Sequence, residues 1–75
     1  MADLKDVVAR NLRRLRQAKG WTQEELADRV GLSVRYGGQV ERGQASMSGT
    51  VLGRFAYALA TDPVDLVRWN PEPKP

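Results

Sequence analysis

The sequence predicts an all-α protein, a compact bundle of five helices in one domain. Apolar residues recur at spacings of three and four, residues that cap helices stand ahead of these segments, and glycines follow several of them. The chain has 75 residues, of which 41% are hydrophobic and none is cysteine, so a single small core is expected. We place this domain at residues 1–69 and expect residues 70–75, which are rich in proline, to form a disordered tail.

The first two helices have clear start and stop signals. Asp3 can cap a helix with apolar residues at helical spacing, which Gly20 ends. Thr22 and Glu25 stand three residues apart at the start of the second helix, the spacing of a capping box.

The second and third helices are separated by a very short turn. The second helix stops at Val30, Gly31 supplies the left-handed residue that ends it, and Ser33 can cap the next helix. Two helices joined so closely must cross at a steep angle, which is the geometry of a helix-turn-helix. In that motif the second helix projects its exposed side into the major groove of DNA.

The remaining helices follow from the same signals. The third runs from about residue 34 to Arg42 and ends at Gly43, and the fourth spans about residues 49–60. Asp62 caps a short fifth helix with Pro63 at its first position.

One side of the third helix carries groups that can read DNA bases. At 100° per residue, an arc of about 140° contains the side chains at Val34, Arg35, Gly38, Gln39 and Arg42. Arginine can pair with guanine, glutamine with adenine, and valine can contact the methyl group of thymine. These side chains would otherwise be solvated surface residues, but their place on the second helix of the motif favours base contacts by Val34, Arg35 and Gln39.

Charge and composition narrow the function. The net charge is +3, and one stretch without acidic residues holds five basic ones, Arg10, Arg13, Arg14, Arg16 and Lys19. An anionic polymer as partner is the functional interpretation of this cluster, but a charge run alone favours a solvated helix face.

Several classes of chemistry are not expected. The absence of cysteine and histidine excludes disulfides, thiolate zinc sites, a cysteine nucleophile and imidazole catalysis. Because no nucleophile with a base, no metal-ligand cluster and no phosphate-binding glycine loop is found, we expect no enzyme, no cofactor and no metal. No apolar run approaches the roughly 18 residues of a membrane span, so we expect a cytoplasmic protein without a membrane partner.

The chain resembles the phage-repressor family of helix-turn-helix regulators, the Xre and Cro type, over residues 4–67. The resemblance rests on LRRLRQAKG at 12–20, TQEELADRVGLS at 22–33, QVERG at 39–43 and ALATDPVDL at 58–66. It implies a lambda-repressor-like DNA-binding domain that regulates transcription, usually as a homodimer on a palindromic operator. It also implies a prokaryotic or phage-encoded protein associated with the nucleoid.

The resemblance also implies roles for single residues. Val34, Arg35 and Gln39 match the base-reading positions, and Arg16 and Glu41 match a pair that bridges the first and third helices. The positions that match contacts to the DNA backbone are Gln23, Ser33, Tyr36, Arg42, Gln44 and Ser46.

Three glycines depart from the family pattern. Gly37, Gly49 and Gly53 stand where the family carries large aliphatic residues that face the core. On the fourth helix the last two share a strip with Ala56 and Ala60. We expect an aromatic side chain to fill this strip; close contact with a partner subunit and a small-ligand cavity are the alternatives.

Two aromatic residues bear on these alternatives. Tyr57 falls on the outer side of the fourth helix, and Trp69 follows the last expected core residue. Together with Gly49 and Gly53 they form a candidate association surface, although we favour Trp69 folding back over the strip.

The sequence thus favours a sequence-specific DNA-binding transcriptional regulator, a repressor or controller, that binds double-stranded DNA. The alternative is a protein-interaction module or antitoxin-like partner that reuses the same fold.

Overall fold

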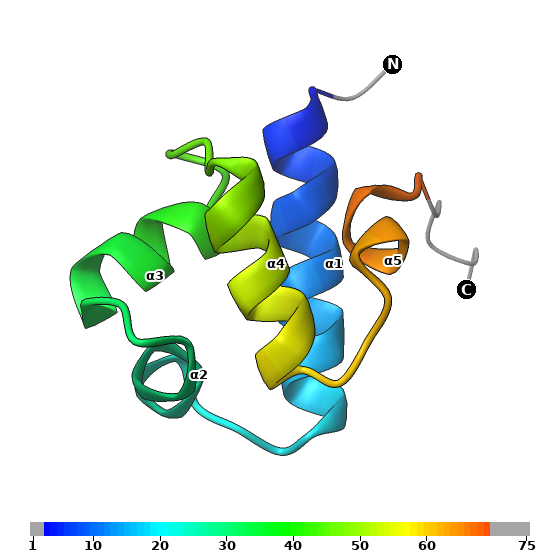
Figure 1. The fold of residues 1–75 in the computed structure, drawn as a ribbon. Helices are drawn as coiled ribbons and strands as arrows, with labels where there is room; N and C mark the ends of the chain where they lie inside the picture. Colours follow the sequence, from blue (N-terminus) through cyan, green and yellow to red (C-terminus); the bar gives the residue numbers. More distant parts are fainter. Residues whose placement is uncertain (1–2, 70–75) are drawn as a thin grey trace, which may run out of the picture.

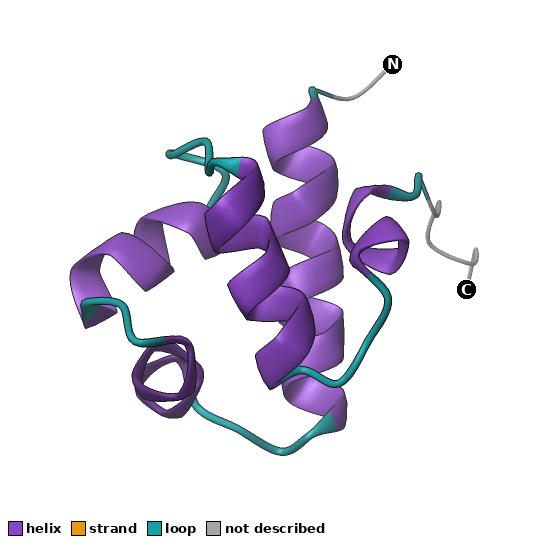
Figure 2. Ribbon diagram, in the orientation of Figure 1, coloured by secondary structure: helices purple, strands orange, loops and turns teal. Residues whose placement is uncertain are grey.

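A computed structural model describes residues 3–69, which contain five helices and no strand (Figure 1, Figure 2). The helices are α1 (Leu4–Ala18), α2 (Gln23–Val30), α3 (Val34–Glu41), α4 (Gly49–Ala58) and α5 (Pro63–Val67). The predicted all-α bundle is therefore confirmed over the described residues. The tail predicted at 70–75 lies outside them. None of the described helices is long and apolar enough to cross a membrane.

The helices pack around α1 and α4, which lie at the centre of Figure 1 with α2 and α3 on one side and α5 on the other. The longest helix, α1, contacts both α3 and α5, whereas α2 contacts α3 and α4. Each helix contributes a fully buried apolar side chain to the core: Leu12, Leu26, Val40, Phe55 and Leu66. This small core holds α3 at the edge of the bundle, with one side free.

Each helix begins at a polar capping residue. The side-chain oxygens of Asp3, Thr22, Ser33, Ser48 and Asp62 each accept a hydrogen bond from a backbone N–H in the first turn. The helix ends differ slightly from the predicted ones. Helix α4 ends at Ala58, not at residue 60, because Ala60 adopts a left-handed conformation with φ of 53°.

A buried asparagine attaches the short helix α5 to α1. Asn11 is almost fully buried, and its Nδ2 donates to the backbone oxygens of Leu66 and Arg68, both at 2.9 Å. A helix of five residues has little stability of its own, so these bonds contribute to its position.

The three unusual glycines do not share one environment. Gly37 is buried, as expected, and a Cβ atom there would lie 3.3 Å from the Cβ of Ala27. The prediction that Gly49 and Gly53 face the core is wrong, because both are exposed and a Cβ at either would have no neighbour within 4 Å. The buried side of α4 is formed by other residues, among them Phe55, and the two glycines point away from it.

The expected aromatic filling of the α4 strip is also wrong. Phe55 points into the core, and the hydroxyl of Tyr36 donates to the backbone oxygen of Ser46 at 3.2 Å. Trp69 does not fold back over the strip, because its ring lies against the guanidinium of Arg10, 5.2 Å from the ring centroid. Tyr57 is 90% exposed, as predicted.

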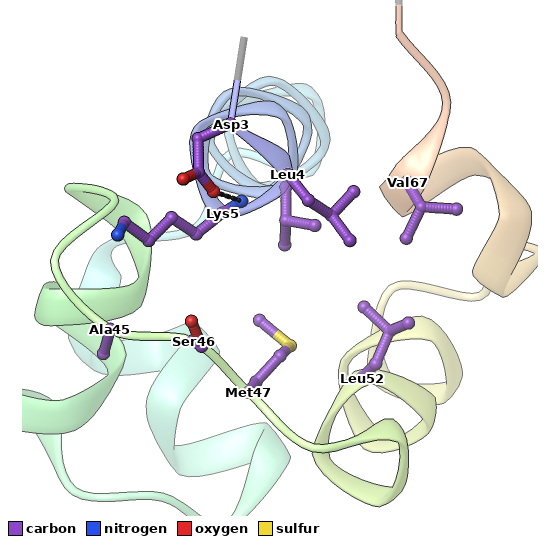
Figure 3. Close-up of a pocket in the computed structure, with 9 residues that line it drawn as sticks. Asp3, Leu4, Lys5, Ala45, Ser46, Met47, Leu52 and Val67 are labelled. Atoms are coloured by element: carbon purple, nitrogen blue, oxygen red, sulfur yellow. Dashed lines mark hydrogen bonds between the residues drawn. The ribbon is translucent and has the colours of Figure 1, made fainter.

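A hollow of about 140 Å³ lies elsewhere, between the start of α1, the loop after α3, α4 and α5. Figure 3 shows the side chains of Leu4, Met47, Leu52 and Val67 around it, with Lys5 and Ser46 at its polar edge. The glycines do not line this hollow; Gly53 borders a separate, more open depression beside Arg54 and Tyr57.

The predicted capping box at the start of α2 is present, and it contains an ionisable side chain, Glu25. The Glu25 carboxylate accepts from the backbone N–H of Thr22 at 3.0 Å, and the Thr22 hydroxyl accepts from the N–H of Glu25 at 3.1 Å. The hydrogen bond from the Thr22 backbone holds the pKa of Glu25 below its ordinary value of 4.5. Because the pKa is lowered in the folded state, the ionised carboxylate stabilises the fold at pH values above 4.5. This stabilisation is lost as the pH falls through the lower, folded-state pKa.

We therefore predict a pH-dependent difference between the wild type and Glu25→Gln. Glutamine accepts the same hydrogen bond but does not titrate. Thermal melts followed by circular dichroism should give a constant difference in Tm above about pH 5.5, which shrinks or reverses toward about pH 3. A difference that does not change over this range would contradict the role assigned to Glu25.

Candidate nucleic-acid interface

The turn between α2 and α3 is held from both sides. Gly31 adopts the left-handed conformation, with φ of 79°, and its N–H bonds to the backbone oxygens of Ala27 and Asp28. From α4, Nη2 of Arg54 donates to the backbone oxygen of Gly31 at 3.3 Å. The side chain of Ser33 then caps α3, accepting from the N–H of Tyr36 at 3.1 Å. The direction of α3 relative to α2 is therefore set by several hydrogen bonds.

The inner side of α3 fits closely against α2. Val40 is buried, and the absence of a side chain at Gly37 lets the α3 backbone approach Ala27. A larger residue at either position of this contact would push the two helices apart.

An ion pair fixes the end of α3 to α1. The Glu41 carboxylate, with a side chain only 2% exposed, accepts from Nε of Arg16 at 2.9 and 3.0 Å. Arg16 is itself 13% exposed, and its Nη1 donates to the backbone oxygen of Trp21 at 2.8 Å. The structure thus contains the pair that the sequence suggested, and Arg16 joins α1, α3 and the segment before α2.

A second arginine supports the same helix end, and sequence reasoning missed it. Nη1 of Arg13 donates to the backbone oxygen of Glu41. Arg13 stands three residues before Arg16, on the same side of α1, and this spacing was the signal for its role. Together the two arginines bind both the side chain and the backbone of Glu41.

The outer side of α3 carries the three predicted base-reading residues. Val34 is 47% exposed, Arg35 is exposed and Gln39 is half-buried. All three lie within one eight-residue helix whose opposite side is buried against α1 and α2. The structure therefore brings them together on a single accessible surface.

The predicted backbone-contact residues surround that surface. Gln23 is the first residue of α2, where helix N–H groups lack intrahelical partners. Gln44 and Ser46 are exposed in the loop after α3, and the hydroxyl of Tyr36 is bonded to the Ser46 backbone. The phenol therefore orders this loop, in addition to any contact that it makes outside the chain.

The basic cluster of α1 does not form a single face. Arg13 and Arg16 turn toward α3, and Arg10 lies against Trp69. Arg14 donates to Asn11 Oδ1 at 3.3 Å, and the ammonium of Lys19 lies 5.9 Å from the centroid of the Trp21 ring. Arg16 pairs with a carboxylate, whereas Arg13, Arg14 and Lys19 remain exposed and keep their positive charge at the surface.

The candidate association surface is divided. Gly49, Gly53 and Tyr57 are exposed at four-residue intervals along α4, whereas Trp69 lies against Arg10 of α1. Within residues 3–69 no group of three or more acidic side chains is placed to hold a metal ion.

Two helices that meet at a tight left-handed turn, the second with its outer side free, define a helix-turn-helix, a class of DNA-binding domain. The model of the helix-turn-helix domain family matches residues 7–69, and the chain belongs to this family.

The chain is similar, in sequence or in structure, to several known proteins. The chain is 40% identical over 65 residues to the HTH-type transcriptional regulator y4dJ of Sinorhizobium fredii, covering 87% of this chain and 84% of that protein. The crystal structure of the hypothetical transcription factor NHTF from Neisseria superposes with a TM-score of 0.85 at 38% identity, covering 88% of this chain and 76% of that one. The restriction-modification controller protein C.AhdI from Aeromonas hydrophila gives a TM-score of 0.79 at 42% identity, covering 83% and 94%.

The buried ion pair leads to a stability prediction. Glu41→Ala leaves the largely buried Arg16 guanidinium without its carboxylate, so we expect a loss of about 3 kcal/mol in the free energy of unfolding, measured by urea denaturation. In the double variant Arg16→Met with Glu41→Leu, which removes both charges, much of the loss should be restored. Wild-type stability for Glu41→Ala would show that the pair does not support α3.

Proposed function

We propose that this protein is a sequence-specific DNA-binding transcriptional regulator that inserts α3 into the major groove. The observation that carries this proposal is the contrast between the two sides of α3. Its inner side is held by Glu41 and Gly37, while its outer side presents Arg35 and Gln39. A rigid helix with planar hydrogen-bonding side chains on its free side suits direct base readout.

The proposed contacts divide into two kinds. Val34, Arg35 and Gln39 contact base edges, which supplies the sequence preference. Contacts to the sugar-phosphate backbone position the domain but carry no sequence information. We assign them to the start of α2 and to the residues around α3, namely Gln23, Ser33, Tyr36, Arg42, Gln44 and Ser46.

The similar proteins support a regulatory role. Their names describe transcriptional regulators and a restriction-modification controller, and on this basis we propose that the chain is a repressor or controller. Because the proposed partner is chromosomal or phage DNA, we propose that the protein acts in the cytoplasm of a prokaryote, at the nucleoid. No enzymatic step, cofactor or metal is part of this proposal.

We further propose that two copies bind a palindromic operator as a homodimer. The accessible side of α4 supports this, because Tyr57 is 90% exposed and a Cβ atom at Gly53 would have no neighbour within 4 Å. A second α4 can approach closely over the glycines and cover the phenol ring. Trp69, which lies against α1, is not part of this surface.

The two kinds of DNA contact predict different mutant behaviour. Arg35→Ala should lose about 1 to 3 kcal/mol of binding free energy at one base position and relax the preference there. Gln23→Ala should weaken binding to all sequences by a similar factor, because it removes a backbone contact. Fluorescence anisotropy titrations on an operator and on random DNA distinguish the two. Equal losses on both DNAs for Arg35→Ala would contradict direct readout.

Selection of bound oligonucleotides from a random pool, repeated at two salt concentrations, tests the dimer and the function together. We expect a palindrome with half-sites about 10 base pairs apart centre to centre, and weaker binding to the full site by Tyr57→Asp with single half-site binding unchanged. An asymmetric single half-site would indicate a monomer. Weak, salt-sensitive binding without sequence preference would instead favour a protein-interaction module.

A further inference from the structure

The side chain of Arg42 turns back along α3 and covers Gly38. A Cβ atom built at Gly38 would lie 2.9 Å from Nη1 of Arg42 and 3.6 Å from its Cζ. Gly38 is buried although it lies on the outer side of α3, whereas Arg42 remains exposed. The guanidinium therefore occupies the space in which a side chain of residue 38 would begin.

The backbone conformation does not explain why residue 38 is a glycine. Gly38 lies inside α3 and is not among the glycines with positive φ, which are Gly20, Gly31 and Gly43. A glycine in the interior of a helix lowers helix stability relative to alanine. The guanidinium of Arg42 is what a side chain at position 38 would meet, so glycine lets Arg42 lie in this place, and a larger residue would displace it.

The guanidinium of Arg42 also forms a hydrogen bond with the loop after α3. Nε of Arg42 donates to Oε1 of Gln44 at 3.2 Å, so one of its five N–H donors is used within the protein. The N–H groups of Nη1 and Nη2 remain available. This arrangement restricts the rotamers of a long side chain before it meets a ligand, which lowers the entropy lost on binding.

The position of the guanidinium places it among the base-reading residues. At 100° per residue, Gly38 falls between Val34 and Arg35 on the outer side of α3. We propose that Arg42 is a base-reading residue, whose two Nη groups pair with O6 and N7 of a guanine from the place left open by Gly38. This inference rests on the proposed function and moves Arg42 from the backbone contacts to the specificity-determining ones.

Arginine suits this task better than other residues. Its planar fork matches the two acceptors of guanine in the major groove, and a bidentate pair discriminates against the wrong base by about 1 to 3 kcal/mol. That energy corresponds to about 5- to 150-fold in affinity. A phosphate contact by the same group would instead weaken binding equally on all sequences when removed.

Arg42→Ala provides the first test, by selection of bound oligonucleotides and by titration of single-base operator variants. We expect the wild type to prefer guanine at one position of each half-site, and the variant to lose about 5- to 150-fold of discrimination there. Preferences at the other positions should be kept. A uniform loss on every sequence, with the slope of log affinity against log salt reduced by about one, would overturn the inference in favour of a phosphate contact.

Gly38→Ala tests the space that the guanidinium occupies. Alanine favours the helix, so Tm should rise by up to roughly 4 to 8 °C, while the displaced Arg42 loses discrimination at the same base position. In the Arg42→Ala background the same substitution should have no further effect on base preference. Full discrimination by Gly38→Ala, or a further loss in that background, would contradict the positioning role.

A readout without DNA separates the inference from the proposed function. The Nε–H resonance of Arg42 in a ¹⁵N spectrum should shift in Gly38→Ala and in Gln44→Ala, because both alter the environment of this group. If the resonance does not respond, the placement of Arg42 is wrong. If the wild type selects no sequence at all, the proposed function fails, whatever the spectrum shows.

Discussion

The orientation of α3 depends on the buried carboxylate of Glu41. Taking a carboxylate out of water is unfavourable unless it is paired and hydrogen-bonded, and here Arg16 satisfies both of its oxygens. Arg16 reaches at the same time to the backbone before α2, and Arg13 binds the backbone of Glu41 itself. Because these bonds are directional, they select one angle and one register of α3 against α1.

The contacts made by the basic residues of α1 change the interpretation of this stretch. A cluster of five basic residues suggests an electrostatic surface for an anionic polymer, yet two of them are directed at the end of α3 and others lie against side chains of this protein. Arg16 is neutralised by a carboxylate, whereas Arg13 and Arg14 contact neutral groups and keep their charge. Besides its charge, α1 supplies the position of α3, through the bonds of Arg13 and Arg16 to Glu41.

Much of this fold follows from local signals in the sequence. The capping box of Thr22 and Glu25, the left-handed Gly31 and the cap of Ser33 all depend on residues within four positions of each other, and the structure has each of them. The wrong predictions concern the rotation of a helix about its axis and contacts between residues far apart in the sequence. Whether Gly53 faces the core depends on how α4 turns against the other helices, and the position of Trp69 depends on Arg10, far away in the sequence. The role of Asn11 could not be predicted from the sequence. Its partners are the backbone oxygens of Leu66 and Arg68, and every residue has a backbone oxygen.

The adjacent glycines of α3 show why a local rule can mislead. Two glycines in an eight-residue helix suggest a flexible element, since each weakens the helix by about 1 kcal/mol relative to alanine. Each glycine in fact allows one close contact, Gly37 with Ala27 on the inside and Gly38 with Arg42 on the outside. The helix is then held at its start by Ser33 and at its end by Arg13 and Arg16. Its order is supplied by neighbouring elements more than by its own propensity, which leaves its outer side free to be chosen for the chemistry of base recognition.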